Sequence, residues 1–178
     1  MGHTEPALIA PAQNVYFSRL LDDVGDGSGA INFNGNYSVT PAVAKIMAGT
    51  DELLNVHRII GVIVDNGAIS ADGYGGLAAL TNGISIGKYD TSDTLVHDIL
   101  DGLTMKSHED IAALCYDLQL VDFGSASAKL VVWRWTFAKD RMAPIVLNPG
   151  ESIRVTLNDS FVGINSHRWL MQGTRIHD

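Results

Sequence analysis

Cysteine is almost absent from the chain, since Cys115 is the only one among 178 residues. A single cysteine cannot form an internal disulfide, which excludes a small secreted scaffold held together by disulfides. Cys115 lies beside Leu114 in an apolar stretch. Such surroundings are typical of a buried, inert thiol and not of a catalytic nucleophile.

Charged residues are also scarce, at 18% of the sequence, against about 25% in soluble domains. This shortage indicates that other subunits cover part of the surface, so we expect a homo-oligomer. Basic residues are in the minority, and the formal net charge is −8. An acidic chain argues against a nucleic-acid partner, because phosphate binding requires a basic face.

Long apolar runs are missing as well. The longest run, near Ile59–Val64, is far shorter than the roughly 18 residues that a membrane span requires. The N-terminal residues lack the charged region and apolar core of a signal peptide, and Pro6 breaks the myristoylation pattern. We therefore expect a soluble protein with no membrane partner.

What the sequence does contain is alternation with a period of two. In Lys129–Ala138, large apolar residues alternate with residues of mixed polarity, and Gly150–Leu157 repeats the pattern. This period predicts two amphipathic β-strands. Asn148-Pro149-Gly150 lies between them and is a tight-turn signal. The residues expected to face the core are Val131, Trp133, Trp135, Phe137, Ile153, Val155 and Leu157.

Further strands and turns follow along the chain. The strand predictions are Val15–Leu21, Asn55–Val64, Tyr116–Phe123 and Arg168–Ile176, with a hairpin or bulged strand at Ile31–Val39. Leu77–Asp90 predicts a short strand, then Asn82-Gly83, then alternation at Ile84 and Ile86. In Asn55–Val64 we expect Val56, Ile60, Val62 and Val64 on one face and His57, Ile59 and Ile63 on the other. The helix predictions are Ser92–Asp101 and Ser107–Cys115, the second capped by Ser107 and Asp110, and Ala42–Ala48 could form a helical turn.

These elements predict one all-β domain over residues 15–178, an antiparallel jelly-roll sandwich of about eight strands with one or two short helices. An immunoglobulin-like sandwich is the second choice, and its Cys…Trp…Cys signature is absent. Residues 1–14 have no periodicity and predict an extended arm. Leu8, Ile9 and Pro11 in this arm are the candidate partner interface, and a frayed terminus is the alternative.

No pattern in the sequence indicates catalysis or metal binding. The six histidines are scattered, and neither the histidine pattern of cupin enzymes nor Gly-x-Ser-x-Gly is present. Asp65, Asp72 and Asp159 could serve as paired carboxylates, but turns favour Asp for local hydrogen bonds. We predict no catalytic residue, no cofactor and no metal site.

Two acidic stretches allow another interpretation. Asp22–Gly29 fails the spacing of a calcium loop and predicts a flexible turn, although Asp22, Asp23 and Asp26 would be the first candidates for a weak ion. Eight acidic residues also lie between Asp90 and Asp122, against one lysine. A solvated face is the first interpretation of that excess, and an ion or partner site is the second.

Four segments together resemble small virion proteins of tailed bacteriophages: NFNGNYSVTPA (Asn32–Ala42), VDNGAISADGYGGLAALTNGISI (Val64–Ile86), LCYDLQL (Leu114–Leu120) and LNPGESIRVTLNDSFVGI (Leu147–Ile164). The resemblance implies a non-enzymatic jelly-roll protein of the virion, assembled in the bacterial cytoplasm. The implied role is a capsid cement or decoration protein that binds the major capsid protein or other virion subunits. Neck, tail and receptor-binding components are the alternative, and a small jelly-roll enzyme is the third choice. The matching positions are turns and strands, so the resemblance assigns no functional residue.

Overall fold

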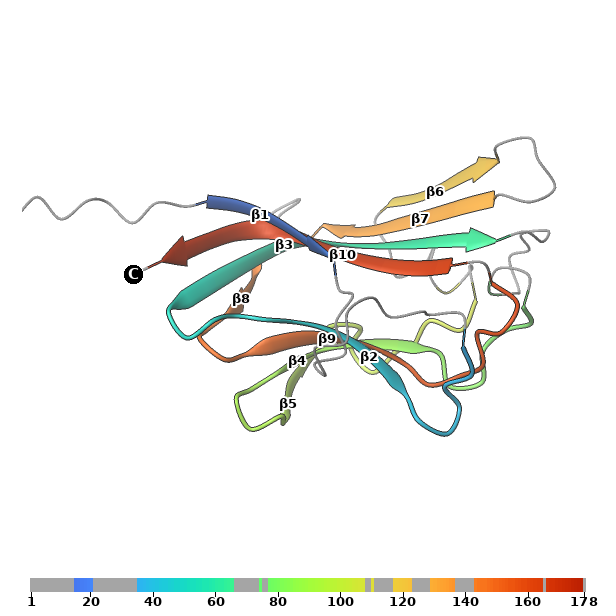
Figure 1. The fold of residues 1–178 in the computed structure, drawn as a ribbon, viewed down its shortest axis with the longest axis horizontal. Helices are drawn as coiled ribbons and strands as arrows, with labels where there is room; N and C mark the ends of the chain where they lie inside the picture. The colour runs from blue at the N-terminus through green and yellow to red at the C-terminus, as the bar shows by residue number, and fades with distance from the viewer. Residues whose placement is uncertain are drawn as a thin grey trace, which may run out of the picture.

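Strands dominate the structure, a computed structural model that describes residues 15–20, 35–65, 74, 77–107, 110, 117–122, 129–136, 143–164 and 166–177. The described strands form two stacked antiparallel sheets (Figure 1). The larger sheet contains β1 (Val15–Leu20), β10 (Ser166–His177), β3 (Glu52–Asp65), β7 (Lys129–Thr136) and β6 (Asp117–Asp122) in that order, with β8 (Ile145–Leu147) also paired to β3. The smaller sheet contains β2 (Ala42–Met47), β9 (Ser152–Leu157), β4 (Ile84–Tyr89) and β5 (Leu95–Asp98).

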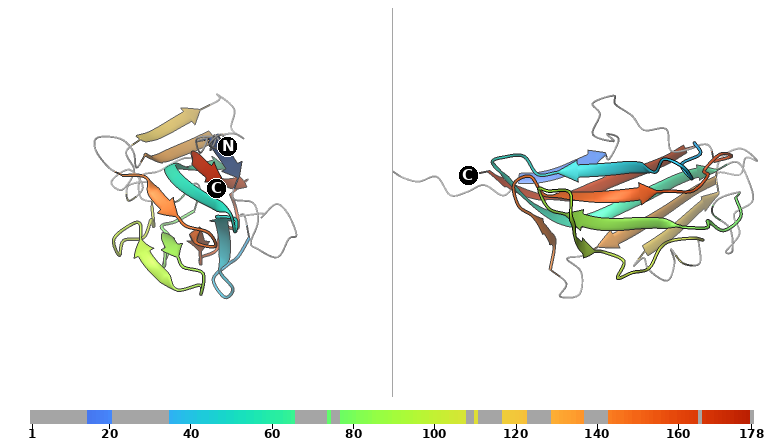
Figure 2. Two further views of the ribbon diagram at one scale, coloured as in Figure 1. Left: turned by 90° about the vertical axis from the view of Figure 1, so that its left-hand side faces the viewer. Right: turned by 90° about the horizontal axis from the view of Figure 1, so that it is seen from below.

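The strand pairing follows a jelly roll. β1 pairs with β10, β2 with β9, β3 with β7 and β4 with β5, all antiparallel, and successive pairs alternate between the sheets. Together these pairs form one long antiparallel ribbon that folds over on itself to build both sheets, and β6 and β8 are extra strands beside it. The predicted all-β antiparallel sandwich is confirmed, and the two layers are seen from the end and from below in Figure 2.

The two amphipathic strands that the sequence predicts on either side of one turn belong to opposite layers. β7 lies in the larger sheet and β9 in the smaller one. The predicted turn at Asn148-Pro149-Gly150 is present, with the Glu151 amide donating to the Asn148 carbonyl at 2.9 Å and Gly150 at φ +79°. However, the turn joins β8 to β9, because the three-residue β8 occupies the space between the amphipathic segments.

The core matches the predicted stripe wherever the structure describes it. Ile153, Val155 and Leu157 are buried, and Trp135 is buried against Trp169, with ring centroids 5.9 Å apart and planes 18° from parallel. Stacked aromatic rings add stabilisation beyond their buried area. The side chains of Val131 and Trp133, and all of Phe137, lie outside the described residues.

A β-bulge changes which residues of β3 face the core. The register against β10 passes from Gln172↔Arg58 to Gly173↔Val56, which leaves His57 as an extra residue. An extra residue reverses the alternation of side chains beyond it. Val56, Ile59 and Ile63 are therefore all buried. The face assignment from the sequence was wrong because it assumed an unbroken period of two.

Two helix predictions were wrong. Ala42–Ala48 contains β2, in which Ala42, Ala44 and Ile46 are buried with a period of two. Ser92–Asp101 contains β5 and a turn: the Asp98 carboxylate accepts hydrogen bonds from the Leu100 and Gly102 amides, at 2.9 and 3.0 Å. Asp forms such local bonds readily in turns, and they compete with a helix.

Two further predictions fall partly outside the described residues. Helix Ser107–Cys115 is described only at Ser107 and Asp110, where the predicted capping contact is present: the Ser107 hydroxyl accepts from the Asp110 amide at 3.2 Å. The Ile31–Val39 segment is described from Gly35. There it bonds across the molecule, because the Phe161 amide donates to Gly35 and the Tyr37 amide donates to Asp159. The described part therefore forms no local hairpin.

Candidate functional site

The predicted interface residues Leu8, Ile9 and Pro11 lie outside the described residues, and so do Asp22, Asp23 and Asp26 of the acidic turn. The arm and the weak-ion site therefore stay predictions. Among the described residues, no group of three or more His, Cys, Asp and Glu side chains lies close enough together to hold a metal ion. In the same part of the chain, no helix is long and apolar enough to cross a bilayer.

Of the three carboxylates considered for catalysis, the structure describes the side chain of Asp159. It is buried, and its oxygens accept hydrogen bonds from three consecutive amides, of Thr81, Asn82 and Gly83, at 2.8–3.2 Å. Through these hydrogen bonds, Asp159 links the segment before β4 to the segment after β9. The side chain of Asp65 and all of Asp72 lie outside the described residues.

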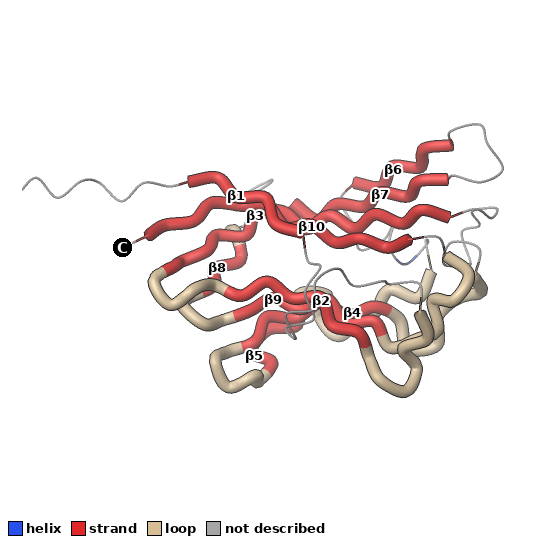
Figure 3. The backbone as a smooth tube through the Cα atoms, in the orientation of Figure 1, coloured by secondary structure: helices blue, strands red, loops and turns tan. Residues whose placement is uncertain are grey.

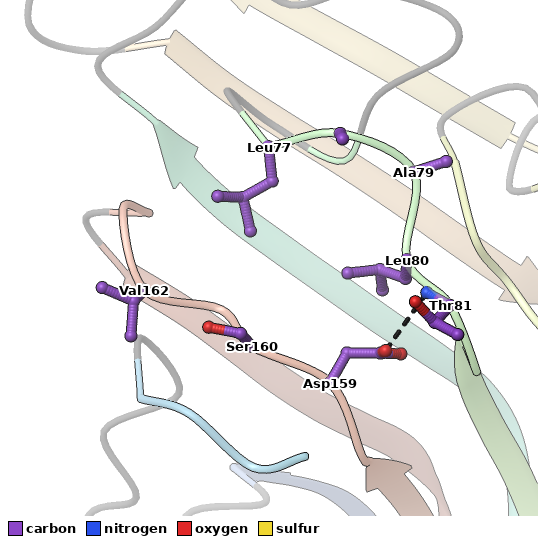
Figure 4. A pocket seen from close by; sticks show the side chains of 8 residues that line it. Leu77, Ala79, Leu80, Thr81, Asp159, Ser160 and Val162 are labelled. Atoms are coloured by element: carbon purple, nitrogen blue, oxygen red, sulfur yellow. Dashed lines mark hydrogen bonds between the residues drawn. The ribbon is translucent and has the colours of Figure 1, made fainter.

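A pocket of about 270 Å³ lies beside Asp159. Figure 4 shows backbone segments 77–81 and 159–162 on its two sides, with the Thr81–Asp159 hydrogen bond at one end. The lining residues are Leu77, Ala78, Ala79, Leu80, Thr81, Asp159, Ser160 and Val162. Among the described residues that line the pocket, Asp159 is the only charged one, and its carboxylate is already bound by backbone amides. We therefore assign Asp159 a structural role at this pocket.

A more distinctive surface lies on the outer face of the larger sheet. The register places three rows of side chains across β10, β3 and β7, beginning with Gln172, Arg58 and Thr136. The second row is Leu170, Ile60 and Arg134, and the third brings Arg168 beside Val62. Neighbouring strands are about 4.8 Å apart and successive rows about 6.6 Å apart, so the rows form one continuous patch.

We call this patch the arginine face, made of Arg58, Ile60, Val62, Arg134, Arg168 and Leu170. Arg168 is exposed and the other five are half-buried. The Arg58 Nε donates to the Thr136 hydroxyl at 3.2 Å, which holds its guanidinium over the sheet. Neither Arg58 nor Arg168 forms an ion pair with a described residue.

The composition of the arginine face is unusual for this chain. The protein carries a net charge of −8, yet the described outer-face side chains of β10, β3 and β7 contain arginine and no carboxylate. On β6, the register places Asp117 opposite Arg134, at the border of this face. Arginine is enriched at protein interfaces, whereas lysine and carboxylates are depleted at their cores. The arrangement can bind a flat, acidic protein surface.

The arginine face was not predicted from the sequence. Its signal was present in Arg58, Ile60 and Val62, which alternate in β3. Because the bulge at His57 was missed, the sequence placed Ile60 and Val62 on the same face as Val56, whereas the structure has Val56 buried and Ile60 and Val62 half-buried on the outer face. A register that included the bulge would have placed arginine and aliphatic residues together on the outside.

No protein-family model matches the chain, and no curated protein or solved structure matches it either. A function for the chain therefore has to be inferred from the fold and from the chemistry of this surface.

Proposed function

We propose that the chain is a non-enzymatic structural protein of a bacteriophage particle, a cement or decoration protein that stabilises the capsid lattice. The observation that carries the proposal is the jelly-roll pairing of β1 with β10, β2 with β9, β3 with β7 and β4 with β5. Viral capsid proteins use this architecture repeatedly. The four segments that resemble phage virion proteins support the same role.

The arginine face gives this role a physical basis. A sheet face is a rigid platform, so its backbone loses little conformational freedom on binding. Arg168 and Arg58 would contact carboxylates of a neighbouring virion subunit, while Ile60 and Leu170 would be removed from water. A partner that binds only the folded, assembled state stabilises that state by mass action. Repeated at every lattice position, even a weak contact strengthens the shell.

The experiment compares particles that carry the chain with particles assembled without it. We expect a copy number comparable to that of the major capsid protein, and DNA release at a lower temperature from particles that lack the chain. Re-addition of purified protein should restore the higher release temperature. Arg168→Glu and a deletion of residues 1–12 test the arginine face and the predicted arm separately. A few copies per particle, with unchanged DNA release, would favour a neck, tail or receptor-binding component, which can have the same type of domain.

A further inference from the structure

The exposed edge of the smaller sheet carries a second surface of unusual composition. β5 is the last strand of that sheet, and in Figure 3 it forms a short strand between two loops. Its side chains Leu95 and Val96 are 50% and 52% exposed, and Leu103 in the following turn is 55% exposed. We call residues 90–103 the β5 edge. Exposed apolar side chains on the edge strand of a sheet are typical of a surface that associates with another chain.

The β5 edge is acidic. It contains Asp90, Asp93, Asp98 and Asp101 and no lysine or arginine. Asp93 pairs with Arg154 of β9, and the other three aspartates form no ion pair with a described residue. The acidic excess noted in the sequence is therefore concentrated, in part, around an exposed apolar strand.

The β5 edge is also held in a fixed shape. The Asp90 carboxylate accepts hydrogen bonds from the Ser92 and Thr94 amides at 2.8 and 2.9 Å. Asp98 holds the turn after β5 in the same way. Both turns therefore keep their conformation without a partner, so binding orders little additional chain.

The two surfaces are complementary in charge and in apolar content. We propose that the β5 edge of one copy of this chain docks onto the arginine face of a second copy. Leu95 and Val96 contact Ile60 and Leu170, and the surrounding aspartates lie against Arg58 and Arg168. The arginine face belongs to the outer side of one layer and β5 to the edge of the other (Figure 2). A single copy therefore cannot bring its own two surfaces together.

A symmetric contact between two β5 strands is disfavoured by charge. Such a contact would bring the aspartates of both copies together, and like charges opposite one another destabilise strand pairs. The contact between different surfaces avoids this repulsion. Since each copy then has one surface of each kind, successive copies form a ring or an open chain. This inference does not depend on the proposed phage role and is tested with the purified chain.

The test uses two variants that each disable one surface, Arg168→Glu on the arginine face and Val96→Lys on the β5 edge. Both positions are exposed, so we expect both variants to fold, which circular dichroism and thermal unfolding check. In analytical ultracentrifugation the parent chain should associate as its concentration rises, whereas each variant alone should stay monomeric. A mixture of the two should form dimers that grow no further, because one intact surface of each kind remains.

Three results would overturn the inference: a parent chain that stays monomeric at all concentrations, variants that associate as the parent does, or a mixture that stays monomeric.

The matched control is Lys45→Glu, which reverses the charge of a half-buried lysine in β2 of the other sheet and should leave association unchanged. Raising the salt concentration from about 0.1 M to about 1 M should weaken association of the parent, because screening shortens the reach of the charges.

Discussion

Arg19 of β1 and Glu52 of β3 form a doubly hydrogen-bonded ion pair across the edge of the larger sheet. The Arg19 Nη2 and Nη1 atoms donate to Glu52 Oε1 and Oε2 at 2.6 and 3.3 Å, and the Gly49 amide also donates to Oε2. The Arg175 Nη1 lies 3.9 Å from Oε1. Glu52 therefore links β1, β10 and the turn before β3.

Replacement of Glu52 by Ala should lower the free energy of unfolding by about 1–3 kcal/mol, because it leaves donors without their acceptor. The Glu52 side chain is 8% exposed and that of Arg19 is 35% exposed, so solvent screens part of the loss. Denaturant unfolding measures the change. Arg168→Ala, at an exposed position, is the control and should change stability by less than about 0.5 kcal/mol. Equal effects of the two substitutions would contradict the role of Glu52.

Gly173 should tolerate no side chain. A Cβ at this position would overlap the backbone carbonyl oxygen of Asn55, opposite the β3 bulge, and the ring of Phe17 lies 3.0 Å away. Backbone on the neighbouring strand cannot move aside as a flexible side chain can. Gly173→Ala should therefore cost about 3 kcal/mol or more, at the upper end of the range for overpacking.

Gly102→Ala separates this clash from the general cost of replacing glycine. Gly102 has φ +82°, and no heavy atom of another segment lies within 4 Å of the position that an alanine methyl group would take. Its substitution should cost only the strain of a left-handed residue, about 1–2 kcal/mol. If thermal unfolding shows Gly173→Ala to be no worse than Gly102→Ala, the close approach at the bulge is absent.

Asp159→Asn tests whether this carboxylate serves structure. The substitution replaces one acceptor oxygen with a donor that faces the amides of Thr81, Asn82 and Gly83. We expect a loss of about 1–3 kcal/mol in the free energy of unfolding, because buried donors lose their acceptor. Unchanged stability, measured by denaturant unfolding, would mean that the carboxylate is available for a ligand in the adjacent pocket.

Because of Glu151, the free energy of unfolding should change with pH in the acidic range. Burial alone would raise its pKa, but hydrogen bonds from Lys88 and Asn148 outweigh burial and hold the pKa below the ordinary value of 4.5. Lys88 Nζ lies 2.7 Å from Glu151 Oε2, and the Asn148 amide donates to the same oxygen at 2.8 Å. A carboxyl group with a lowered folded pKa stabilises the fold above its unfolded pKa, and that contribution is lost as the pH falls through the folded value.

Stability of the parent chain should therefore decline below about pH 4.5 more steeply than that of Glu151→Gln. Urea unfolding at a series of pH values measures both slopes. Lys88→Met removes the charged partner and should flatten the profile in part. Parallel profiles for the parent and Glu151→Gln would show that the group titrates alike in the folded and unfolded chains.

Local patterns in the sequence predicted the class of fold because most strands carry their own signal. β9 alternates apolar and polar residues, the second half of β3 is a continuous apolar run, and Gly150 marks the turn before β9. These signals depend on neighbours along the chain. By contrast, no local pattern states that β7 and β9 lie in opposite sheets. That separation follows from pairing between strands far apart in sequence, with β8 inserted before β9.

The wrong predictions have similar physical causes. Leu95, Val96, Ile99 and Leu100 have helical spacing, but Asp98 fixes a turn by bonding to the amides of Leu100 and Gly102. The bulge at His57 reverses the faces of β3, and only the register with β10 reveals it. The arginine face was missed for this second reason. A surface formed by three strands cannot be identified until their register is known.

The most direct measurement of the central claim is the position of the chain in an image reconstruction of the virion in which the proposal places it. The proposed role predicts density for the two-layered sandwich at repeated positions on the capsid lattice, with the arginine face turned toward a neighbouring subunit. Density confined to the tail or neck, or particles that contain no such density, would contradict a capsid cement protein.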